Sequence, residues 1–84
     1  MGRKKLPPEV WEQRRRVGLA VRTARQTAGL NLPQLAQSID ISRPYLSHIE
    51  AGRKPLTDDL AVRLSRALGI HKVSLTDPAQ DVAA

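Results

Sequence analysis

Apolar residues recur at helical spacing in four segments of the chain, and helix-capping residues separate these segments. The pattern predicts helices over residues 9–28, 32–39, 43–51 and 57–68. Residues that cap helix N-termini precede the last three: Asn31, Ser42 and Thr57. Gln34 completes a capping-box pattern with Asn31. Glycines that suit helix ends follow the first, third and fourth segments. The sequence therefore predicts an all-α fold.

The first predicted helix has one apolar side, formed by Val10, Val17, Ala20, Val21, Ala24 and Ala28. Five arginines occupy the rest of its surface: Arg14, Arg15, Arg16, Arg22 and Arg25. Gly18 weakens the middle of this helix and suggests a bend. Trp11 and Leu19 lie off the apolar stripe. Because an exposed tryptophan on a basic helix is unusual, we expect Trp11 to pack either on Val73 and Leu75 or on a partner subunit.

The third predicted helix has two chemically different sides. Leu46 and Ile49 form an anchoring side, with Tyr45 at its border. The opposite side carries donors and small apolar groups: Arg43, Pro44, Ser47, His48 and Ala51. The short helix before it ends only three residues earlier. Two helices joined by a tight turn, with the second half-exposed, meet the physical requirement for placing a helix in the major groove of DNA.

The basic charge of this 84-residue chain is concentrated at one end. The net charge is +6, with a pI of about 10.8. Residues 1–25 contain eight basic and two acidic side chains, whereas residues 26–84 contain six of each. This distribution favours a polyanionic partner. We expect a basic arm over residues 1–8, one folded domain over 9–76 and a frayed tail over 77–84.

Several classes of protein do not fit the composition. The chain has no cysteine, which excludes disulfides and a cysteine zinc site, and it has only two histidines. Ser47 and His48 are adjacent on a helix and do not face each other, so they form no catalytic pair. There is no glycine-rich phosphate loop, no membrane-length apolar run and no signal peptide. We expect a cytoplasmic, non-enzymatic protein without a cofactor, a metal or a small-molecule ligand.

Three segments carry a resemblance to a known family: RTARQTAGL (22–30), LPQLAQSIDISRPYLSHIEAGR (32–53) and LAVRLSRALGI (60–70). They resemble the lambda-repressor-like, Cro-type helix-turn-helix domains. The resemblance implies a compact bundle of four or five helices that binds duplex DNA, usually as a dimer, and most often represses transcription. The family usually has Gly at the turn where this chain has Asp40, which tolerates a left-handed conformation better than most residues.

The resemblance also implies roles for individual residues. The positions that face base edges are Arg43, Pro44, Ser47 and His48. Ser42 and Tyr45 match backbone-contacting positions, and Arg53 and Lys54 match a basic loop near phosphate. Glu50 matches an acid with a structural role. The family often has Gln or Ser-Gln at the start of the second helix, where this chain has Asn31-Leu32-Pro33, so Asn31 or Gln34 would have to supply the phosphate contact.

The basic arm adds a further expectation, because Arg3, Lys4 and Lys5 could wrap the duplex or enter its minor groove. Together these features predict a dimeric repressor that binds an inverted-repeat operator, with Trp11 as a candidate dimer contact. The alternative is a protein-interaction module, an antitoxin or adaptor, whose DNA binding is weak or depends on a partner.

Overall fold

The computed structural model describes residues 6–75. Within this range the chain forms four α-helices and one short 3₁₀ helix: α1 (Pro8–Thr27), α2 (Leu32–Ser38), α3 (Arg43–Glu50), α4 (Asp58–Leu68) and η1 (Lys72–Leu75). Each boundary of the α-helices lies within one residue of its prediction, and the all-α fold is confirmed. The expected arm contacts Arg3, Lys4 and Lys5, and the tail over 77–84, lie outside the described residues.

Side-chain capping explains where α2, α3 and α4 begin. The Asn31 side chain accepts a hydrogen bond from the backbone N–H of Gln34, and the Gln34 side chain accepts one from the N–H of Asn31, both at 2.8 Å. Ser42 and Thr57 cap α3 and α4 in the same way, accepting from Tyr45 and Leu60. Asp40, in the turn between α2 and α3, has the left-handed conformation that its position predicted, with φ of 61°.

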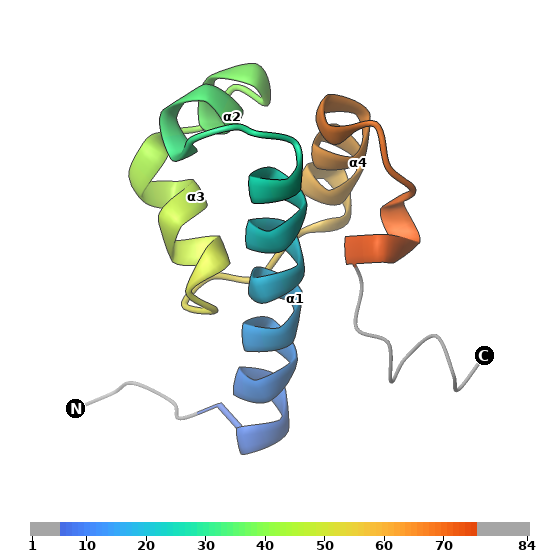
Figure 1. Cartoon of the computed structure of the whole chain (residues 1–84). Helices are drawn as coiled ribbons and strands as arrows, with labels where there is room; N and C mark the ends of the chain where they lie inside the picture. The colour runs from blue at the N-terminus through green and yellow to red at the C-terminus, as the bar shows by residue number, and fades with distance from the viewer. Residues whose placement is uncertain (1–5, 76–84) are drawn as a thin grey trace.

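The core lies where the helices converge, and all of them contribute to it. The side chains with no exposed surface are Val21, Leu35, Leu46, Leu64 and Leu75. Leu75, at the end of η1, therefore packs inside the domain. The predicted apolar side of α1 is less buried than the sequence indicated: Val10 is only half-buried and Ala28 is exposed. The N-terminal part of α1 extends beyond the other helices (Figure 1), so Val10 has few neighbours to pack against.

Gly18 lies where α1 approaches α3 most closely. A Cβ atom at this position would lie 2.5 Å from the carbonyl oxygens of both Ile49 and Glu50. The helix α1 continues through Gly18 from Pro8 to Thr27. The glycine is needed for space, because any larger residue would push the end of α3 away from α1.

Replacing Gly18 with alanine should lower the free energy of unfolding by about 1–3 kcal/mol, because the new methyl group overlaps the backbone of α3. Alanine is the better helix former by about 1 kcal/mol, so an exposed glycine would show the opposite effect. Urea unfolding followed by circular dichroism measures the difference. Thr23→Ala, at an exposed position on α1, is the control and should change stability by less than about 0.5 kcal/mol. A Gly18→Ala protein as stable as the original would contradict the close approach.

Candidate nucleic-acid interface

The helix α3 is anchored on one side and open on the other. Leu46 and Ile49 are completely buried in the core, and Tyr45 is half-buried beside them. Arg43, Pro44 and Ser47 are exposed, and His48 is partly exposed. The structure thus brings the four predicted base-contact residues together on the exposed side of one helix, with none of them needed for the core. This arrangement presents hydrogen-bonding groups on a rigid element.

The residues at the starts of α2 and α3 that are predicted to contact the DNA backbone also cap these helices, as the sequence indicated. The oxygens of Asn31 and Gln34 are occupied by the capping box at the start of α2. Their amide nitrogens remain available as donors. The Ser42 oxygen caps α3, and its hydroxyl hydrogen can still be donated. Capping therefore fixes the orientation of these side chains while leaving each of them one donor group for an anion.

The loop after α3 is held against the end of that helix. The backbone N–H groups of Arg53 and Lys54 both donate to the carbonyl oxygen of His48, at 2.8 and 3.2 Å. The two side chains are exposed. They therefore project from a fixed loop that adjoins the exposed side of α3, as their predicted contact with phosphate requires.

An ion pair between α1 and α3 is the feature that the sequence pattern did not predict. We expected Arg25 on the outer surface of α1, but its side chain is only 12% exposed and that of Glu50 only 7%. Arg25 donates from Nε and Nη2 to the two carboxylate oxygens of Glu50, at 2.8 and 3.1 Å. Its Nη1 donates to the carbonyl oxygen of Leu30. The structural role expected for Glu50 is thus to hold Arg25 and, through it, the end of α3.

The hydrogen bonds from Arg25 to Glu50 raise the pKa of Arg25 above its usual value, against the opposing effect of burial. Its guanidinium group therefore stays charged throughout the physiological range. The stability that this raised pKa contributes is present at neutral pH and is lost only as pH rises above the ordinary pKa of arginine. Arg25 is consequently no pH switch in the physiological range.

Two large apolar side chains on α1 are exposed. Trp11 is 41% exposed and Leu19 is 61% exposed. The Arg14 guanidinium lies 5.7 Å from the centre of the Trp11 ring, a cation–π contact. Within the described part of the chain, no three acidic or histidine side chains come together as metal ligands would. The described helices also include none with the length and apolarity needed to cross a membrane.

Breaking the Arg25–Glu50 pair should destabilise the fold strongly. Arg25→Met leaves a carboxylate in a dry site, and we expect the free energy of unfolding to fall by about 3–5 kcal/mol. Arg25→Met combined with Glu50→Leu removes both charges and should recover much of this decrease. Urea unfolding of the two single variants and the double variant measures the coupling. If the two single effects simply added in the double variant, Arg25 and Glu50 would not be energetically coupled, and the pair would not hold α3 against α1.

Known proteins share both the sequence pattern and the arrangement of helices. A family model described as helix-turn-helix matches residues 21–75. Two relatives from Mycobacterium tuberculosis, each named an uncharacterized HTH-type transcriptional regulator (MT0491 and Rv0474), are 35% identical over 69 residues. The match covers 75% of this chain and 49% of each relative, so the chain spans about half the length of these proteins.

Solved structures of other helix-turn-helix regulators have the same arrangement of helices. The clp gene regulator ClgR from C. glutamicum superposes with a TM-score of 0.73 at 32% identity, covering 86% of this chain and 94% of that protein. The restriction-modification controller protein C.AhdI from Aeromonas hydrophila gives a TM-score of 0.70 at 26% identity, covering 73% and 92%. Since the family model matches well over half of the residues, the chain belongs to the Cro/C1-type helix-turn-helix family of transcriptional regulators.

Proposed function

We propose that this protein binds duplex DNA at a specific sequence and represses transcription there as a homodimer. The observation that carries the proposal is the two-sided α3: Leu46 and Ile49 are buried, while Arg43, Pro44, Ser47 and His48 lie on the accessible side. A helix anchored in this way can enter the major groove without disturbing the core packing. Because the proposed partner is the chromosome, we also place the protein in the cytoplasm.

The exposed side of α3 has the chemistry to distinguish bases. The Arg43 guanidinium can donate two parallel hydrogen bonds to guanine O6 and N7. Ser47 and His48 can donate or accept, and Pro44 can contact a thymine methyl group. Each well-formed bidentate contact discriminates against the wrong base by about 1–3 kcal/mol. We therefore assign sequence selection to these four residues.

Contacts to the DNA backbone come from the elements on either side of α3. The candidate donors are the side chains of Asn31, Gln34, Ser42, Tyr45, Arg53 and Lys54. Contacts of this kind fix the register of the protein on the duplex and carry no sequence information. The arm residues Arg3, Lys4 and Lys5 lie outside the described residues, and their contact with the duplex stays a prediction of the sequence.

A symmetric dimer would place two copies of α3 in successive major grooves, with half-sites centred about 34 Å apart in an inverted repeat. Occupation of such an operator blocks access of RNA polymerase to an overlapping promoter. The names of the relatives support regulation, since ClgR is titled a gene regulator and C.AhdI a controller protein. No catalytic role is proposed for Ser47 and His48, because adjacent side chains on α3 diverge by about 100°.

Arg43→Ala and Arg53→Ala should change DNA binding in different ways. Removing the Arg43 side chain should relax base preference at one position of each half-site, at a cost of about 1–3 kcal/mol for the preferred site. Removing the Arg53 side chain should weaken binding to all sequences alike. The slope of log affinity against log salt should become shallower by about 0.9 per protomer, which corresponds to one phosphate contact. Binding of a panel of duplexes at several salt concentrations, measured by fluorescence anisotropy, separates the two effects. An unchanged base preference after Arg43→Ala would refute the proposed register of α3.

We also propose that Trp11 contributes to the dimer interface, because it is a large apolar side chain left 41% exposed. Trp11→Ala should weaken self-association at least about tenfold, as expected for a tryptophan at an interface. Sedimentation equilibrium measures the effect. Thr23→Ala, at an exposed polar position on α1, is the control and should leave association unchanged. A dimer unaffected by Trp11→Ala would remove this residue from the interface.

A further inference from the structure

The three consecutive arginines at positions 14–16 have different surroundings. Arg14 lies over the ring of Trp11. Arg16 is one turn from Glu12 on the same helix, with 3.9 Å between Nη1 and the Glu12 carboxylate. Arg15 instead lies against the loop that follows α3: a Cβ placed on Gly52 would be 2.8 Å from its Cγ. Of the three, Arg15 is the one directed toward the end of α3.

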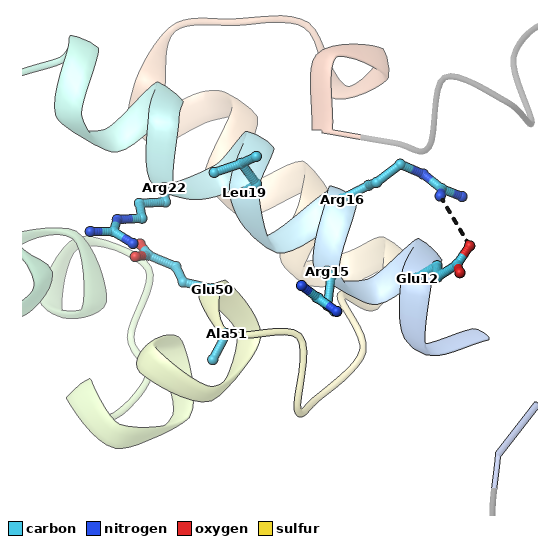
Figure 2. Close-up of a pocket in the computed structure, with 7 residues that line it drawn as sticks. All are labelled: Glu12, Arg15, Arg16, Leu19, Arg22, Glu50 and Ala51. Carbon is cyan, nitrogen blue, oxygen red and sulfur yellow. Dashed lines mark ion pairs between the residues drawn. The ribbon is translucent and has the colours of Figure 1, made fainter. Parts of the chain in front are cut away.

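Arg15 and Arg22 lie on the same side of α1. Seven residues make nearly two helical turns, so the two side chains emerge about 20° apart and about 10 Å from each other along the helix. Both line a hollow between α1 and the end of α3, together with Leu19, Glu50 and Ala51 (Figure 2). The same arrangement brings both arginines to the α3 side of the molecule.

Arg22 also lines a second hollow, which it shares with Ser47 of α3 and Leu32 of α2. Ser47 is one of the residues assigned to base contact. Arg22 is therefore beside the surface that would face the major groove, although its position on α1 gives no indication of this in the sequence. Arg15 is beside the loop of Arg53 and Lys54, through its contact with Gly52.

The acidic groups in this region are occupied by other cations. Both oxygens of Glu50 accept hydrogen bonds from Arg25. Glu12 is paired with Arg16 (Figure 2). Among residues 6–75, Arg15 and Arg22 are exposed and take part in no ion pair. Two available guanidinium groups thus extend the positive surface of Arg53 and Lys54 along α1.

We infer that Arg15 and Arg22 contact two separate phosphates of the DNA backbone, and that α1 forms a second anchor beside the recognition helix. This inference rests on the proposed function and adds a DNA-contacting element to it. Guanidinium groups suit the role, because they stay charged and pair with phosphate oxygens in a bidentate way. The contacts would be independent of base sequence, so they would strengthen specific and nonspecific binding alike.

The test compares the Arg15→Gln/Arg22→Gln double variant with the original protein on mixed-sequence duplex DNA, over about 50–200 mM KCl. Glutamine keeps the helical preference of these positions, and circular dichroism checks the fold. The slope of log affinity against log salt should become shallower by about 0.9 for each phosphate that the variant no longer neutralises. A charge-preserving Arg15→Lys/Arg22→Lys variant should keep most of the slope.

The control is Arg66→Gln combined with Arg14→Gln, which changes the charge equally. Arg66 lies on α4, away from the hollows that Arg15 and Arg22 line, and Arg14 lies over Trp11.

The possible results distinguish a failure of the proposed phosphate contacts on α1 from a failure of the proposed DNA binding itself. A shallower slope in the double variant and an unchanged slope in the control support the anchor. If Arg53→Ala reduces the slope but the double variant does not, the anchor is refuted and the proposed function stands. An equal change in the control and the double variant also refutes it, because only net charge would then matter. If the original protein fails to bind duplex DNA even at about 50 mM salt, the proposed function itself fails.

Discussion

The close approach of α1 to the end of α3 fixes the orientation of α3, which carries the candidate base contacts. Gly18 permits it, because no side chain separates the two backbones there. The Arg25–Glu50 pair then fixes it, since both charges are largely withdrawn from water and satisfy each other. A buried pair of this kind is weak evidence for net stability, but it strongly penalises any displacement that separates its partners. The exposed side of α3 and the loop of Arg53 and Lys54 depend on this crossing for their orientation.

The sequence predicted what local chemistry decides. The capping box of Asn31 and Gln34, the caps Ser42 and Thr57, and the left-handed Asp40 all act within a few residues, so the helix boundaries followed from their spacing. The spacing of apolar residues also predicted the buried and exposed sides of α3. The features that the sequence did not predict depend on contacts between distant segments. Arg25 and Glu50 are 25 positions apart, so helical periodicity along α1 could only place Arg25 with the other arginines. The reason for Gly18 was missed because its neighbours belong to α3.

The packing of α1 against α3 gives the arginines of α1 different surroundings. Five arginines on α1 look equivalent in the sequence, yet one locks α3, one lies over Trp11 and one lies close to Glu12. The remaining two, Arg15 and Arg22, border the α3 side of the molecule. The arginines of α1 are thus divided between those held by other side chains and those that border the exposed side of α3. The chain spans about half the length of the curated relatives that it matches.

We propose that this chain alone recognises a DNA sequence through α3. The decisive experiment is the selection of random duplex DNA by the purified protein near physiological salt. We expect enrichment of an inverted repeat with half-site centres about 34 Å apart, one helical turn of DNA. Binding without enrichment, or enrichment only in the presence of a second protein, would contradict the claim and would favour a partner-dependent interaction module.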